Sequence, residues 1–130
     1  VDMLDVVFQE LPREKPCHLL GIGHPEDILP IITAGVDTFD CIVPTQYARH
    51  GIAFTSRGRL DMHKSLFLND KKPLDIACAC EVCAVYSRAY ITHLLRAQEI
   101  TALRLLTFHN LFFFHAMVAR IREDIARGKL

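Results

Sequence analysis

The sequence has no excess charge of either sign, because 15 lysines and arginines are matched by 15 aspartates and glutamates. A chain without net charge has no overall field that attracts nucleic acid, so such binding would need a local patch. The sequence also lacks an uninterrupted run of the roughly 18 apolar residues that indicates a membrane-spanning helix. Its most apolar stretch, 103–121, is broken by Arg104, His109, Asn110 and His115. We therefore expect no membrane span.

Three further features are absent: a secretory signal pattern at the N-terminus, internal repeats and low-complexity segments. We expect one cytoplasmic domain or a piece of a larger one. The hydrophobic fraction is nevertheless 51%, with a mean hydropathy of +0.20. This is high for a small domain, which has much surface for its volume. The surplus predicts faces that are covered by another subunit or by a missing part of the same fold.

The first third of the chain has a strand–helix–strand pattern. Residues 17–23 and 36–44 are short apolar runs, typical of buried strands. Between them, 24–35 carries helix signals: a cap at His24, Pro25 in the first turn and a stop at Gly35, with Pro30 shortening or kinking the helix. So short a crossover implies parallel strands in a sheet covered by helices.

The rest of the chain predicts small antiparallel strands and then two helices. Residues 45–73 contain short alternating runs, and residues 85–98 have apolar positions at helical spacing. A last helix is predicted over 109–127, and Gly128 is its stop. Its apolar face consists of Phe114, Val118, Ile121 and Ile125.

Three of the five cysteines, Cys78, Cys80 and Cys83, lie within six positions. They are too close for comfortable disulfide pairing, and clustered thiols in a reducing compartment favour metal binding over ordinary burial. With His109 they would form a closed tetrahedral zinc site of structural type. His93 and His115 are the alternative fourth ligands, whereas Cys17 and Cys41 fall in the predicted strands as core residues.

Asp40 lies inside the otherwise apolar run 36–44, where a buried carboxylate is costly unless it is paired or useful. Functional side chains of parallel α/β folds gather at the carboxyl ends of strands, and Asp40 is near such an end. It is therefore a candidate nucleophile. The alternative is an aspartate that binds turn amides, and Asp37 is a weaker candidate.

A local surplus of positive charge follows the second predicted strand. It comprises Arg49, Arg57, Arg59 and Lys64, joined by His50 and His63, with Tyr47 and Phe54 as possible stacking surfaces. Phosphate contacts and aromatic stacking are typical of RNA binding. Most such runs are solvated surface, and the patch alone does not decide between the two.

Taken together, the motifs "LLGIG", "GVDTFDCIVPT", "CACEVC", "YSRAY" and "LLTFHN" closely resemble the C-terminal part of the tRNA-guanine transglycosylases, or queuine tRNA-ribosyltransferases. The resemblance runs from about residue 11 to the C-terminus. It implies the C-terminal part of an irregular (β/α)8 TIM barrel, an α/β fold with an inserted zinc-binding subdomain. Three segments follow: a barrel βαβ segment over 1–44, a basic loop and zinc subdomain over 45–110, and a C-terminal helix packing on the barrel over 111–130.

The resemblance also implies an activity and a set of site residues. The family exchanges guanine at the tRNA wobble position for a 7-deazaguanine base, queuine or its precursor preQ1. By position, Asp40 matches the nucleophile and Gly21 lines the base pocket. Thr45, Gln46 and Arg49 match the loop that grips the anticodon region of tRNA, and the ligands of one structural Zn2+ per chain match Cys78, Cys80, Cys83 and His109.

Two departures from the family pattern matter. Gln46 stands where the family loop has its first arginine, and family members are about three times this length. We therefore expect a fragment whose missing N-terminal half supplies the general acid/base, and a homodimer. Two alternatives remain: a non-catalytic zinc-containing module for RNA binding or dimerisation, and a sister enzyme of archaeosine synthesis.

Overall fold

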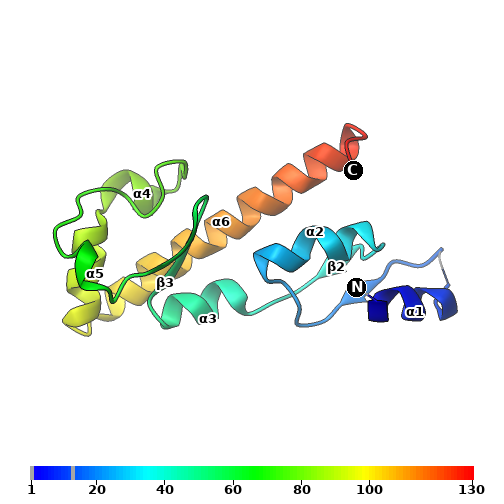
Figure 1. Cartoon of the computed structure of the whole chain (residues 1–130), viewed down its shortest axis with the longest axis horizontal. Helices are drawn as coiled ribbons and strands as arrows, with labels where there is room; N and C mark the ends of the chain where they lie inside the picture. Colours follow the sequence, from blue (N-terminus) through cyan, green and yellow to red (C-terminus); the bar gives the residue numbers. More distant parts are fainter. Residues whose placement is uncertain (1, 13) are drawn as a thin grey trace. The chain divides into compact units, whose positions relative to one another are not determined.

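The computed structural model describes residues 2–12 and 14–130, which fall into two compact units. One unit contains the chain up to residue 43 together with 120–130, and the other contains residues 44–119. Figure 1 traces the elements along the chain.

The first unit is built on a parallel pair of short strands. It contains α1 (Asp2–Glu10), β1 (His18–Leu19), α2 (Pro25–Thr33) and β2 (Thr38–Phe39). β1 and β2 pair in parallel, which confirms the predicted crossover. The predicted strands over 17–23 and 36–44 are too long, and His18 is exposed rather than buried. No helix was expected where α1 forms.

Helix α2 forms where its end signals predict it. His24 is the N-cap in extended conformation, Pro25 opens the helix, and Gly35 follows it with a φ of 110°. That φ lies in the left-handed region, which glycine adopts without strain. The helix runs past Pro30 to Thr33. Its buried face packs with α1 in a small core of Phe8, Ile31 and Val36.

The second unit holds an antiparallel hairpin and most of the helical residues. The elements that contribute to it are α3 (Val43–Arg49), β3 (Ile52–Thr55), β4 (Gly58–Asp61), the 3-10 turn η1 (Ser65–Phe67), α4 (Glu81–Val85), α5 (Arg88–Arg96) and α6 (Ile100–Ala126). The β3–β4 pairing confirms the antiparallel strands predicted within 45–73. The segment expected as a basic loop after Pro44 is instead helical, as α3.

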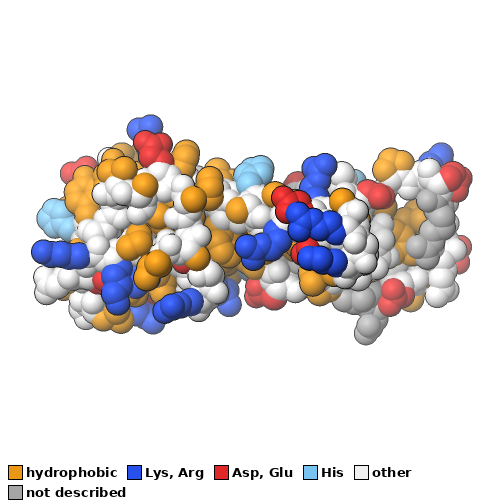
Figure 2. Space-filling model, turned by 90° about the horizontal axis from the view of Figure 1, so that it is seen from above, with side chains coloured by type: hydrophobic (Ala, Val, Ile, Leu, Met, Phe, Trp, Pro, Cys, Tyr) orange, Lys and Arg blue, Asp and Glu red, His pale blue; other side chains and the backbone are white. Residues whose placement is uncertain are grey.

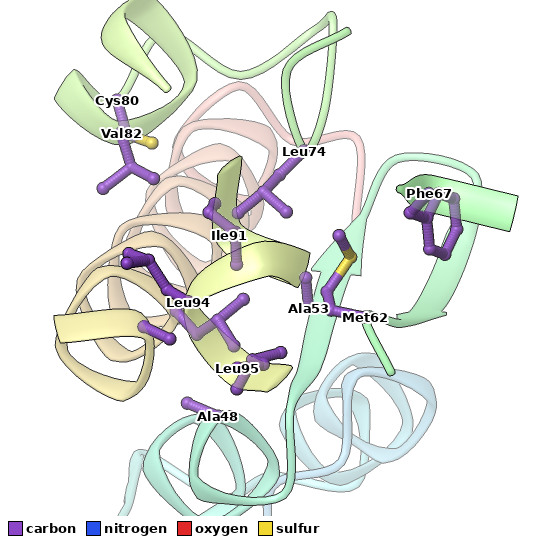
Figure 3. Close-up of a cluster of buried hydrophobic side chains, with 12 residues drawn as sticks. Ala48, Ala53, Met62, Phe67, Leu74, Cys80, Val82, Ile91, Leu94 and Leu95 are labelled. Carbon is purple, nitrogen blue, oxygen red and sulfur yellow. The ribbon is translucent and has the colours of Figure 1, made fainter. Parts of the chain in front are cut away.

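The core of this unit gathers side chains from nearly all its elements. Figure 3 shows Leu74, Ile91, Leu94 and Leu95 packed with residues from α3, β3 and α4. Full burial of one such leucine or isoleucine contributes about 1.5–3 kcal/mol. This core places α5 against the hairpin and the segment that carries the cysteines.

The last helix, α6, begins nine residues earlier than the predicted start at 109. The reason lies in Ala102 and Leu106, which are fully buried and extend the core-facing stripe by two turns. By length and composition α6 is also apolar enough to cross a membrane. Its His109 and Asn110 are fully buried and hydrogen-bonded within the protein, so this part of α6 lies in the core of the second unit.

Asn110 joins α6 to the hairpin through three hydrogen bonds. Its Oδ1 accepts from the Phe54 amide at 3.0 Å, and its Nδ2 donates to the carbonyls of Pro44 at 3.0 Å and Ile52 at 2.9 Å. The side chain is fully buried. An unpaired buried polar group costs about 1–3 kcal/mol, so this amide satisfies backbone groups that would otherwise destabilise β3.

We predict that Asn110→Leu lowers the free energy of unfolding by about 3 kcal/mol or more, because one amide and two carbonyls lose their partner. Chemical denaturation measures the effect. Arg104→Leu, at an exposed position of the same helix, is the matched control and should change stability by less than about 0.5 kcal/mol. Equal effects of the two substitutions would contradict this role of Asn110.

Candidate metal centre and strand-end carboxylate

Three sulfurs and one imidazole nitrogen converge beside α6. The distances from His109 Nδ1 to the Sγ atoms are 3.8 Å for Cys78, 3.4 Å for Cys80 and 3.4 Å for Cys83. All four ligand atoms lie within 4.8 Å of one another. The segment with the three cysteines and the helix with His109 therefore meet, and the four residues are positioned to bind a metal ion.

The spacing of these atoms fits tetrahedral coordination. A tetrahedral metal with sulfur at about 2.3 Å and nitrogen at about 2.0 Å separates the two ligand atoms by about 3.5 Å. The distances of 3.4–3.8 Å bracket this value. A closed set of four protein ligands leaves no position for water or substrate, which is typical of a structural metal site.

The backbone around the cysteines is arranged to stabilise thiolates. The Cys80 sulfur accepts from the Cys83 amide at 3.4 Å, and the backbone amides of Cys80 and Asp75 act to lower the pKa of the Cys78 and Cys83 thiols. Cys80 is also the N-cap of α4, which explains the two-residue spacing to Cys83. Without a metal, burial outweighs these effects: it raises the pKa of the Cys78 thiol, and it raises the pKa of the Cys83 thiol to about 12. A bound cation would reverse that balance.

His109 is oriented by its second ring nitrogen. Its Nε2 donates to the Phe54 carbonyl at 2.8 Å, which leaves the Nδ1 lone pair facing the sulfurs. Burial lowers the pKa of His109 and keeps the ring neutral, the form that binds metals. The rival ligands His93 and His115 are exposed, and neither belongs to the cluster. The sequence had suggested that His109 lies at the start of the last helix. It lies inside α6 instead, because α6 begins at Ile100.

Asp75 connects the cysteine segment to the hairpin. Its carboxylate accepts from the amide and hydroxyl of Ser56 at 2.7 and 2.9 Å, and from the amide of Ala77 at 3.0 Å. Burial alone would raise the pKa of Asp75, but these hydrogen bonds lower it on balance. Asp75 was not singled out by the sequence analysis, and neither was Asn110. For Asn110 the available signal was the motif "LLTFHN", which contains it.

Asp40 directly follows β2, at the carboxyl end of a parallel strand. It is exposed in this chain, with 60% of its side chain accessible, so the expectation of a buried carboxylate is wrong. The reason is that β2 ends at Phe39. The Oδ1 of Asp40 lies 3.3 Å from the His18 Nε2 and accepts from the Gly21 amide at 3.4 Å. Asp37 instead accepts from the Cys17 amide at 2.7 Å, which is a structural role.

The other predicted site residues lie on or near α3. Gln46 and Arg49 are exposed and three residues apart on that helix, whereas Thr45 is half-buried. Phe54 is buried and cannot serve as an exposed stacking surface, which corrects that expectation. Tyr47 packs against Phe54. The guanidinium carbon of Arg59 lies over the Tyr47 ring, 5.7 Å from its centroid. Figure 2 shows Lys and Arg side chains interspersed with acidic and apolar ones on the face it draws.

The pKa shifts predict how the metal-free protein depends on pH. The thiol pKa values are raised above 9.0, so their contribution to stability is complete below pH 9 and lost as the pH rises toward 12. The pKa of His109 is lowered from 6.5, so its contribution is complete above that pH and lost on acidification. Chelator-treated protein should be most stable between about pH 6.5 and 9.

For the metal-loaded protein we expect release of the ion on acidification, because protons compete for His109 and the thiolates. Metal content after dialysis at a series of pH values, with denaturation curves before and after chelation, checks both expectations. Retention of the ion to pH 4 and a metal-free stability independent of pH would contradict this assignment of the ligands.

Comparison with known proteins identifies the family. The family model described as "Queuine tRNA-ribosyltransferase" matches residues 1–130. Relatives with this name include those of Thermoanaerobacter pseudethanolicus, 46% identical over 99% of this chain and 34% of the relative, and Halothermothrix orenii, 44% identical over 100% and 35%. That of Rickettsia bellii is 44% identical over 98% and 35%. The chain thus spans about a third of the length of these curated relatives. It belongs to the queuine tRNA-ribosyltransferase family.

Proposed function

We propose that this chain is the part of a tRNA-guanine transglycosylase that carries the nucleophile and a structural zinc site. The observation that carries the proposal is an exposed carboxylate at the carboxyl end of a parallel strand, in a chain of this family. Such strand ends are where catalytic side chains gather in α/β barrels. We also propose the barrel, to which this chain would contribute one βαβ crossover.

The proposed metal is zinc. Three thiolates and an imidazole are soft and borderline ligands that favour Zn2+ over magnesium or calcium. When bound, the ion would hold Cys78, Cys80 and Cys83 to His109 and stabilise the fold, because binding free energy in such sites is coupled to folding. The closed ligand set gives it no catalytic part.

The proposed reaction uses Asp40 in two displacements. A carboxylate oxygen of Asp40 forms a bond to C1′ of the ribose, while the bond from C1′ to the guanine nitrogen breaks and its electron pair leaves with guanine. The incoming 7-deazaguanine base, queuine or preQ1, then bonds to C1′ as the bond to Asp40 breaks. The carboxylate is regenerated, and the two bases exchange one proton through an acid/base group outside this chain.

The proposed RNA contact is the exposed side of α3. Thr45, Gln46 and Arg49 lie within five residues, so the arginine can reach a phosphate while the glutamine offers a neutral amide to the anticodon region. Gly21, whose amide lies 3.4 Å from Asp40 Oδ1, is close enough to the nucleophile to line the base pocket. A neutral Gln46 in place of a cation supplies less electrostatic attraction to tRNA.

The proposed partners are tRNA, the remaining N-terminal part of the barrel and a second copy of the protein, in the cytoplasm where tRNA is modified. Large apolar side chains are exposed on the second unit, among them Val85, Ile100, Phe108 and Phe112. Soluble monomers rarely expose extensive apolar area, so these side chains support cover by further protein.

A covalent trap tests the function. The chain is combined with the N-terminal part of the Thermoanaerobacter pseudethanolicus relative and with substrate tRNA, and the mixture is denatured. We expect a denaturation-resistant protein–RNA adduct that falls at least about 100-fold in Asp40→Asn, because an amide is a poor nucleophile. Asp37→Asn keeps an acceptor for the Cys17 amide and is the matched control, with unchanged adduct.

Two results would overturn the proposal. An adduct that persists in Asp40→Asn would place the nucleophile elsewhere. The absence of any adduct from a folded, metal-loaded assembly that binds tRNA would favour the non-catalytic binding module.

A further inference from the structure

The two short strands of the first unit have one polar and one apolar face. His18 pairs with Thr38 across the strands, and Leu19 pairs with Phe39. Side chains alternate along a strand, so Thr38 and Asp40 point to the same side, which is also the side of His18. Leu19 and Phe39 pack on the opposite side against the core of α1 and α2. The alternation thereby gathers His18, Thr38 and Asp40 on one surface.

These three side chains form a chain of contacts. His18 Nδ1 lies 2.8 Å from Thr38 Oγ1, and His18 Nε2 lies 3.3 Å from Asp40 Oδ1. An ionised carboxylate can only accept, so Nε2 carries the proton in this contact. In the neutral ring Nδ1 then accepts from the Thr38 hydroxyl. Asp40 therefore selects the tautomer of His18, and the contact with Thr38, whose hydroxyl can donate or accept, fixes the plane of the ring.

The two carboxylate oxygens of Asp40 differ in their hydrogen bonds. Oδ1 has two donors, His18 Nε2 at 3.3 Å and the Gly21 amide at 3.4 Å. Over residues 2–12 and 14–130, no hydrogen bond to Oδ2 is formed. The Asp40 side chain is exposed, with 60% of its surface accessible. Oδ2 is thus the oxygen available to an incoming group.

We propose that His18 is a positioning residue for Asp40: it holds Oδ1, with Thr38 fixing the ring, so that Oδ2 attacks the ribose. The inference rests on the proposed function, because it assigns the orientation of the same nucleophile. When Oδ2 bonds to C1′ and guanine leaves with the electron pair, Oδ1 becomes the ester carbonyl oxygen and still accepts from both donors. The nucleophile therefore keeps one orientation through both displacements.

The test compares matched pairs of variants in the covalent-trap assembly. His18→Phe keeps a flat ring but loses the donor, and Thr38→Val keeps the shape but loses the hydroxyl. We expect both to slow adduct formation, His18→Phe by about 10- to 100-fold, as misplacement of a reacting group does. His18→Gln, whose amide donates from a similar position, and Thr38→Ser should stay within about threefold of wild type. The affinity for tRNA should be unchanged in all four.

Three outcomes would overturn the inference, and they are distinguishable from failure of the function. Wild-type rates in His18→Phe, with Asp40→Asn inactive, would remove His18 alone. Equal loss in His18→Phe and His18→Gln with weakened tRNA binding would make His18 an RNA contact. An adduct that persists in Asp40→Asn would refute the nucleophile and leave His18 nothing to position.

Discussion

The second unit depends on the way α6 binds a single residue of β3. The amide of Phe54 donates to Asn110, and its carbonyl accepts from His109. Two consecutive side chains of one helix thus satisfy both backbone groups of one strand residue. Both side chains are fully buried, where unpaired groups would be costly. The arrangement fixes the rotation of α6 about its axis relative to the hairpin.

The same interaction prepares the metal site. Because Nε2 of His109 is committed to the Phe54 carbonyl, only Nδ1 is left for the sulfurs. On the other side, the Asp75 carboxylate accepts from the Ser56 amide in the turn of the hairpin, and the Asp75 carbonyl accepts from the Cys78 amide at 3.2 Å. Hydrogen bonds therefore connect α6 to β3, and the turn after β3 to Asp75 and the cysteine segment. A metal bound by the cysteines and His109 would join the two ends of this series of contacts.

Much of this organisation could be predicted from local patterns. The spacing of Cys78, Cys80 and Cys83 indicated a metal site because clustered thiols have few other uses in a reducing compartment. The helix signals at Pro25 and Gly35 gave α2 nearly to the residue, since each acts on its own stretch of backbone.

Features that depend on tertiary contacts could not be predicted in this way. The choice of His109 over His93 depends on which side of each helix faces the core. The early start of α6 depends on the burial of Ala102. An alanine in the sequence does not by itself indicate whether the position is buried. An apolar run also predicted a buried Asp40, whereas the strand ends before it and leaves the carboxylate exposed. The pairing of His18 with Asp40 needed the strand register, which the sequence does not specify.

The measurement that tests the account most directly is X-ray absorption spectroscopy of the purified, metal-loaded protein. It reports the metal and its ligand atoms together. The account predicts zinc with three sulfur ligands at about 2.3 Å and one nitrogen at about 2.0–2.1 Å. A shell without sulfur, or one with two sulfurs and oxygen ligands, would show that His109 and the cysteines do not form a closed site, and that no metal joins α6 to the cysteine segment.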